Sequence, residues 1–154
     1  MAANNSKTAL DLFKAGSNCS QAVLSTYFPL MNLDGRLGHK MGTGLGAGVG
    51  RKQYICGAVN AGAIIISLLY GGEKSSEQDK KEKTYGEVIT YINKFEAKFK
   101  SSQCREILGM EIATESGRKK ATEMNLFATT CVSCIKKVCE ILDEKFTDIT
   151  GTAL

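Results

Sequence analysis

The chain has 154 residues, of which 43% are hydrophobic and 23% charged, and its formal net charge is +4. This length and composition predict one globular domain over residues 1–154, and they exclude a mini-protein that depends on disulfide staples. The basic residues are interleaved with Asp and Glu rather than gathered in a stripe with aromatic side chains. We therefore expect solvated helix faces and no nucleic-acid partner.

No segment has the pattern of an export signal or a membrane span. Residues 1–7 are polar and lack the apolar stretch of a secretory signal. The longest apolar run, residues 58–70, contains Asn60 and Ser67 and is shorter than the roughly 18–20 residues that a span needs. We expect no membrane span and a cytoplasmic location. Six cysteines in that reducing compartment favour metal binding or redox chemistry over structural disulfides.

Helices are the elements that the sequence predicts. The chain has a single proline, and its apolar residues recur at helical spacing, which favours an all-α, single-domain helical bundle. The first helix is predicted over residues 6–15 and is closed by Gly16. The second is predicted over residues 19–27, with Ser17 or Asn18 as its cap. Pro29 ends it.

A glycine-rich segment follows over residues 35–50. It has neither the spacing of a dinucleotide-binding loop nor the Lys-Ser or Lys-Thr pair of a phosphate-binding loop. On a helix, Gly42, Gly46 and Gly50 would form one row of small residues, and Gly44 and Gly48 a second. The segment therefore predicts close approach of another backbone, or a tight loop.

The remaining predicted helices vary in polarity. Residues 56–70 predict a central buried helix, and residues 104–108 a short helix capped by Ser101 or Ser102 and ended by Gly109. Residues 114–125 are polar, and we expect a mobile connection there. The last helix is predicted over residues 130–145. Residues 75–100 predict a long charged helix with these residues on its apolar face: Tyr85, Val88, Ile89, Ile92, Phe95 and Phe99.

Four cysteines lie at the predicted starts of helices: Cys19, Cys56, Cys104 and Cys131. The first turn of a helix has unpaired N–H groups and the positive end of the helix dipole, so a cysteine there is held more readily as the thiolate. The thiolate is the form that attacks disulfides and binds metals. Four such positions would suit a thiolate-ligated cluster, whose sulfurs also accept N–H donors. The plain alternative is that these cysteines are buried as small hydrophobic residues.

The other candidate residues carry weaker signals. Cys131 and Cys134 form a C-x-x-C motif on one helix face, but the βαβ unit of thioredoxin-like proteins is missing; Cys139 points elsewhere and is expected in the core. His39, the only histidine, is expected to be exposed. Glu106 and Glu111 are assigned to surface or capping roles.

Several stretches resemble one family, the small four-cysteine C-GCAxxG-C-C proteins, to which a redox role is ascribed. The resemblance covers about residues 8–145 and rests on residues 16–24, the glycine run to Arg51, Cys56-Gly-Ala-Val-Asn, residues 104–109 and Cys131. It implies a helical fold and a redox or metal role for the four shared cysteines. The sequence departs from the pattern at Ala61, where the family has Gly, and Cys134 and Cys139 are additions.

These observations lead to three hypotheses. In the first, the four cysteines converge and bind an iron–sulfur cluster for electron transfer or sensing. In the second, two of them work as a cofactor-free thiol–disulfide oxidoreductase, with Cys134 assisting. In the third, the protein is a helical binding module, plain or stabilised by zinc. No redox partner or substrate is indicated, and a helical protein of this size can form a homodimer.

Overall fold

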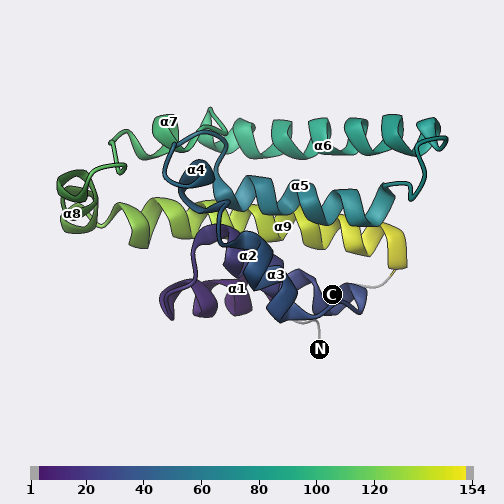
Figure 1. Cartoon of the computed structure of the whole chain (residues 1–154), viewed down its shortest axis with the longest axis horizontal. Coiled ribbons are helices and arrows are strands. Elements are labelled where there is room, and N and C mark those ends of the chain that lie inside the picture. Colours follow the sequence, from purple (N-terminus) through teal and green to yellow (C-terminus); the bar gives the residue numbers. More distant parts are fainter. Residues whose placement is uncertain (1–3, 152–154) are drawn as a thin grey trace.

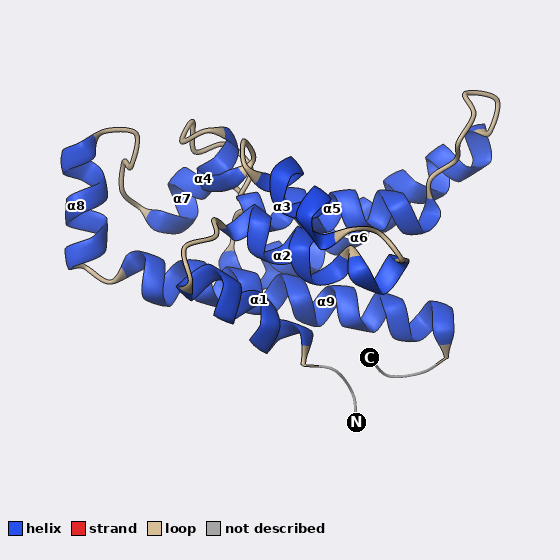
Figure 2. Ribbon diagram, turned by 60° about the horizontal axis from the view of Figure 1, so that its bottom comes forward, coloured by secondary structure: helices blue, strands red, loops and turns tan. Residues whose placement is uncertain are grey.

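The computed structural model describes residues 4–151, and every regular element in this range is a helix. An isolated bridge between Ile55 and Gln103 is the one β-type pairing between residues 4 and 151. The all-α prediction is therefore confirmed (Figures 1 and 2). The helices are α1 Asn5–Lys14, α2 Cys19–Tyr27, η1 Pro29–Met31, α3 Gly35–Gly42, α4 Gly46–Val49, α5 Gly57–Tyr70, α6 Gln78–Phe99, α7 Cys104–Leu108, α8 Glu115–Glu123, η2 Phe127–Cys131 and α9 Val132–Thr150.

Helix α5 forms the centre of the fold. It packs against α2, α6 and α9, and in Figure 1 it runs beside α6 and α9 along the long axis of the molecule. Its Ile65 and Ile66 are completely buried, as are Tyr91 and Phe95 of α6 and Ile135 of α9. Burying side chains of this size contributes about 1.5–3 kcal/mol each. The prediction of a central buried helix is confirmed.

Close packing of glycines joins α2 and α3. A Cβ on Gly38 would lie 2.7 Å from the Leu24 carbonyl oxygen, and one on Gly42 would lie 2.7 Å from the Gln21 nitrogen. The predicted close approach of another backbone therefore occurs at Gly42, in a row that begins one turn earlier, at Gly38. Helix α3 ends at Gly42, and a Cβ on Gly44 or Gly50 would meet nothing within 4 Å.

Four of the six residues predicted on the apolar face of α6 pack against the core: Val88, Ile92, Phe95 and Phe99. The other two do not. Tyr85 is 56% exposed and Ile89 is 59% exposed, whereas Thr84, Tyr91 and Phe95 are buried. The phenol of Tyr91 donates to the carbonyl oxygens at the start of α5, and it fills the space beside Gly62, where a Cβ would lie 2.0 Å from its oxygen. Tyr91 therefore adds a buried polar anchor that the hydrophobic pattern does not indicate.

Residues 114–125 are mostly helical, so the prediction of a mobile connection there is wrong. Thr114 caps α8 by accepting a hydrogen bond from the Gly117 nitrogen at 3.1 Å. The Arg118 guanidinium donates to the carbonyl oxygens of Ile112 and Ala113 and so ties α8 to the preceding loop. A cap and a tether to buried Ile112 order a segment whose exposed face is polar.

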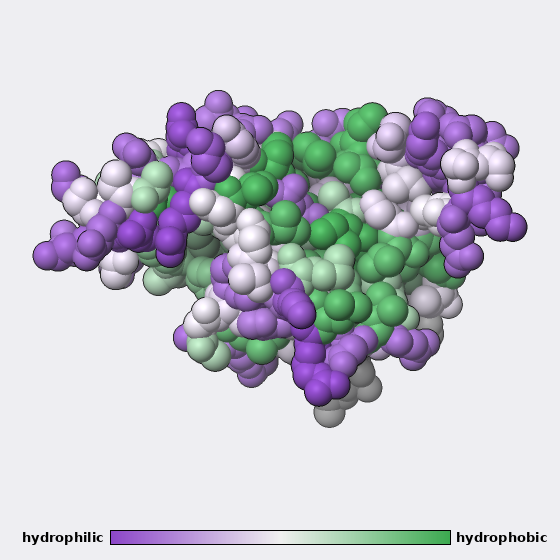
Figure 3. Space-filling model, in the orientation of Figure 1, coloured by the Kyte–Doolittle hydropathy of each residue, from purple (hydrophilic) through white to green (hydrophobic). Residues whose placement is uncertain are grey.

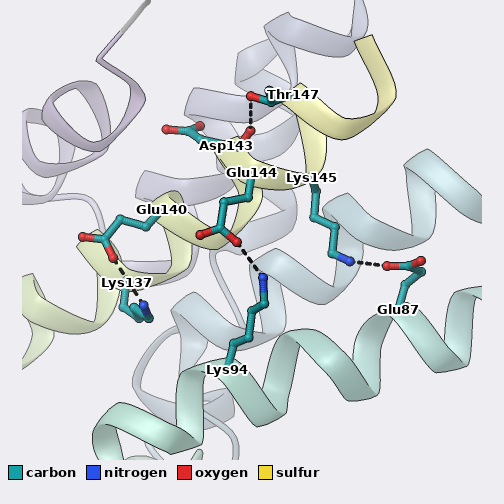
Figure 4. Close-up of polar contacts among 8 residues, drawn as sticks. All are labelled: Glu87, Lys94, Lys137, Glu140, Asp143, Glu144, Lys145 and Thr147. Atoms are coloured by element: carbon teal, nitrogen blue, oxygen red, sulfur yellow. Dashed lines mark hydrogen bonds and ion pairs between the residues drawn. The ribbon is translucent and has the colours of Figure 1, made fainter. Parts of the chain in front are cut away.

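Polar contacts fasten α9 to its neighbours (Figure 4). Lys94 of α6 pairs with Glu144 of α9 at 2.6 Å, and Lys145 of α9 pairs with Glu87 of α6. The second pair is largely shielded from water, because the Lys145 side chain is 11% exposed and that of Glu87 is 26% exposed.

Apolar side chains also reach the surface. Figure 3 shows hydrophobic surface over the middle of one face, around α5 and α3. Leu37 and Met41 of α3 and Leu68 of α5 are each 45% exposed or more. Between residues 4 and 151, no helix is both long and apolar enough to cross a membrane.

Candidate functional site

The four cysteines that the sequence analysis singles out as site residues line one cavity of about 210 Å³. It lies where the N-terminal ends of α2, α5 and α7 approach the junction of η2 and α9. The sequence intervals between Cys19, Cys56, Cys104 and Cys131 are long, so only the fold brings these residues together. A fifth thiol, Cys134, lines the same cavity.

Cys19 begins α2 directly after the Asn18 cap. The Asn18 side chain accepts from the Gln21 nitrogen at 2.8 Å, and the Gln21 side chain accepts from the Asn18 nitrogen at 2.9 Å, which completes a capping box. The Asn18 amide also donates to the carbonyl oxygens of Gly42 and Thr43 at 3.2 Å each. Asn18 therefore fixes both Cys19 and the glycine-rich segment that covers it.

Cys56 precedes α5, and Gly57 leaves the room that its neighbours need. The Cys56 nitrogen donates to the Ser102 carbonyl at 2.8 Å. A Cβ on Gly57 would lie 2.6 Å from the Cys19 sulfur and 2.8 Å from the Leu45 carbonyl oxygen. The Cys56 thiol shares hydrogen bonds with the thiols of both Cys19 and Cys134. A side chain at position 57 would therefore press on this group of thiols.

Cys104 begins α7, but its backbone nitrogen donates to the Tyr54 carbonyl at 2.7 Å. The Gln53 side chain hydrogen-bonds to the Cys104 thiol, donates to the Met110 carbonyl and accepts from the Ile112 nitrogen. Gly48, at φ +65°, is also close, since a Cβ there would lie 2.8 Å from the Cβ of Cys104. Backbone and amide groups thus hold Cys104 at the cavity wall. The predicted caps are wrong, because the N-cap is Gln103, without a side-chain bond.

Cys131 does not begin a helix. Its backbone is right-handed helical at φ −64° and ψ −38°, and it joins the π-helical turn η2 to α9. The expected start near residue 130 is therefore wrong, and Thr129 instead donates its hydroxyl to the Asn125 carbonyl at 2.7 Å. The π-helical turn adds backbone length within a continuous helix, a geometry that often marks functional sites. Cys134 lies about one turn further along and is 2% exposed.

The prediction that these cysteines are held as thiolates is wrong for this state of the protein. The hydrogen bond to Cys56 and burial raise the pKa of Cys19 well above 9.0, and the hydrogen bond to Cys134 and burial raise that of Cys56. Burial and the nearby Cys19 raise the pKa of Cys104 to about 11. Burial, then Cys19 and Cys104, raise the pKa of Cys131 to about 12. Desolvation and the grouping of like ionisable thiols outweigh the helix ends.

The rest of the cavity wall is mainly apolar. Its hydrophobic side chains are Phe13, Ile107, Leu108, Ile112 and Phe127. Two cations, the exposed Arg51 and the half-buried Arg118, complete it. An apolar wall excludes water from sulfur, and the two arginines favour an anionic occupant.

The possible metal donors at the cavity are its thiols. In residues 4–151 no three His, Cys, Asp or Glu side chains converge tightly enough to hold a metal ion. The thiols instead spread over a wall contributed by several helices, without His or carboxylate among them. Thiolate sulfur is the usual protein ligand of iron–sulfur clusters. The chemistry of the donors fits such a cluster, and binding would drive loss of the thiol protons.

The sequence does not indicate every residue of the site. The C-x-x-C motif places Cys134 on the same predicted helix face as Cys131, yet its thiol partner is Cys56. The role of Gln53, at φ +57° and 2% exposed, carries no sequence signal. The expectations for two residues outside the cavity are confirmed: Cys139 is completely buried in the core, and His39 is exposed.

Comparison with known proteins gives one match. The family model described as "Putative redox-active protein (C_GCAxxG_C_C)" matches residues 17–145, which contain all five cavity cysteines. No curated protein and no solved structure matches the chain.

Proposed function

The chain belongs to the C_GCAxxG_C_C family, and from this premise we propose that Cys19, Cys56, Cys104 and Cys131 bind an iron–sulfur cluster used for electron transfer or sensing in a reducing compartment. One observation supports the proposal above all: cysteines from distant parts of the sequence line a single cavity whose remaining wall is mainly apolar. Plain packing of cysteines as small hydrophobic residues would not gather them at one cavity.

The residues around the cavity have distinct tasks in this proposal. The four cysteines are the ligands, and a bound cluster would supply one-electron chemistry. Asn18 and Gln53 fix two of the ligands through the backbone contacts described above. Phe13 and Phe127 contribute to the apolar wall. Arg51 and Arg118 balance the negative charge that four thiolates bring.

Anaerobic reconstitution with iron and sulfide tests this function. We expect a brown protein with charge-transfer absorption and bound iron and sulfide. Replacing any one of the four cysteines by Ser should reduce the bound iron, whereas Cys139→Ser should leave it unchanged, because Cys139 lies in the core away from the cavity. A protein that stays colourless and iron-free after reconstitution would refute the proposal.

A second candidate function, a cofactor-free thiol–disulfide oxidoreductase, is favoured by the thiol–thiol contacts at Cys56. A disulfide substrate could oxidise two neighbouring thiols to a protein disulfide and leave as two small thiols, and the Cys56 thiol has two hydrogen-bonded thiol neighbours. This function predicts one labile disulfide and catalytic turnover of a disulfide substrate in protein without iron. If the iron-free protein shows no turnover and all thiols titrate alike, this candidate fails.

A further inference from the structure

Cys134 is the cavity thiol that the proposed ligand set does not use. It is the more deeply buried member of its pair, 2% exposed against 8% for Cys56, and it reaches the cavity from α9 while Cys56 reaches it from the start of α5. The two helices pack side by side (Figure 1). A fifth thiol beside a four-cysteine site requires a role of its own.

The neighbours of Cys134 distinguish it from the other cysteines. Its thiol hydrogen-bonds to Cys56. Cys131, one turn earlier, is influenced instead by Cys19 and Cys104. Both cysteines of the C-x-x-C motif line the cavity, but the thiol that pairs with Cys134 is that of Cys56 and not that of Cys131. This partner of Cys134 lies 78 residues away in the sequence.

We propose that, in the cluster-free protein, Cys134 is a resolving cysteine that closes a reversible disulfide with Cys56 and so withdraws one ligand from the cluster site. This inference rests on the proposed function for its consequence, but the disulfide itself does not need a cluster. It makes the ability of the site to accept a cluster dependent on the thiol–disulfide balance of its surroundings.

A low-molecular-weight disulfide is the oxidant that converts the two thiols to the protein disulfide. The more accessible Cys56 attacks this disulfide as the thiolate, forms a mixed disulfide and releases one small thiol. Cys134 then attacks the Cys56 sulfur, and the second small thiol leaves. Two protein thiols are oxidised, one external disulfide is reduced to two thiols, and the two protein protons end on those thiols. An excess of small thiol reverses both steps.

The position of Cys134 makes intramolecular closure faster than attack by a second external molecule. Its sulfur is held beside Cys56 by the packing of α5 against α9, so it attacks at high effective concentration. The same burial restricts direct access of the oxidant to Cys134. Both thiols are buried, and the less buried one, Cys56 at 8% exposed, reacts first, while Cys134 at 2% completes the bond.

Disulfide mapping of the iron-free protein tests the proposal. Reduced full-length protein is incubated without oxygen with bis(2-hydroxyethyl) disulfide, alkylated, digested and analysed by mass spectrometry. We expect a Cys56–Cys134 linked peptide, the loss of two alkylation sites and the recovery of both after dithiothreitol. A disulfide between Cys19 and Cys56, one between Cys131 and Cys134, or no disulfide at all would overturn the proposal.

Variants distinguish the role of Cys134 in the proposed disulfide from the role of the four cluster ligands. Cys134→Ala should accumulate the mixed disulfide on Cys56 after oxidation instead of a linked peptide, and in its reduced form it should load iron and sulfide like the wild type. Wild type should lose loading after oxidation and regain it after dithiothreitol. Cys139→Ala is the matched control, a buried cysteine of α9 outside the cavity, and should behave as wild type throughout. Circular dichroism verifies that each variant is folded, and Cys134→Ser provides a second replacement.

The results distinguish this proposal from the proposed function. If reduced wild type never binds iron but the linked peptide forms, the cluster function fails and the disulfide stands. If Cys134→Ala and Cys134→Ser are folded yet both fail to load iron under reducing conditions, Cys134 is itself a ligand, and the resolving role is refuted.

Discussion

Gly57 controls the position of the Cys19 sulfur, and Gly57→Ala is the substitution that tests the site most directly. The added Cβ would lie 2.6 Å from the Cys19 sulfur, whereas ordinary contacts begin at 3.4 Å. The sulfur must therefore move by about 0.8 Å if it alone gives way. The Leu45 carbonyl oxygen, 2.8 Å from the new Cβ, blocks relief on that side.

The expected energies follow from this geometry. Overpacking of this kind costs about 1–3 kcal/mol. Alanine returns less than about 1 kcal/mol through its higher helix propensity, because position 57 lies in the first turn of α5. The iron-free protein should therefore be slightly less stable. The effect on a bound cluster should be larger, since disturbing the groups that orient a ligand costs about 10–100-fold in metal affinity.

Chemical denaturation of the iron-free protein and iron titration under anaerobic conditions measure the two effects separately. Gly86→Ala is the matched control: this glycine lies in α6, is exposed, and a Cβ there would meet nothing within 4 Å. It should stabilise the protein by up to about 1 kcal/mol and leave iron binding unchanged. If Gly57→Ala is as stable as wild type and binds iron equally well, the sulfur is not confined as described and the reasoning is refuted.

Three further predictions concern the fold, the thiols and the exposed apolar face. Glu87→Gln should cost about 1–3 kcal/mol in denaturation experiments because it leaves the shielded Lys145 ammonium without its partner, whereas Glu144→Gln in the exposed pair should cost at most about 1 kcal/mol; equal costs would contradict the burial argument. The pKa of Cys104 is raised from 9.0 to about 11 on folding, so its contribution to stability is intact below pH 9 and is lost as the pH rises toward 11, and Cys104→Ser should flatten that decline in the iron-free, reduced protein. The predicted homodimer would bury exposed apolar side chains such as Leu68, so Leu68→Lys should convert a dimer to a monomer in light scattering, and a monomeric wild type would refute the prediction.

The sequence determined the helical fold and most helix positions because the signals involved are local. Asn18 and Gln21 form a capping box within one turn, and Gly109, at φ +65°, ends α7 in the left-handed region that glycine favours. The apolar length of residues 57–70 likewise marked the central helix. Such features need no knowledge of distant residues. The inward position of Tyr91 in α6 was not predicted, because its phenol bonds to carbonyls of another helix.

Only the tertiary structure decided how the cysteines meet and how they ionise. The sequence identified four of them, but it could not place Cys134 beside Cys56, since that contact depends on the packing of α5 against α9. It also suggested lowered thiol pKa values from helix starts. The fold reverses that expectation, because hydrogen bonds between the thiols and burial raise the pKa of Cys19 and Cys56 by more than the nearby backbone N–H groups, such as that of Val59, lower it. Ionisation depends on the solvent and charges around each sulfur, and those are set by residues far away in the chain.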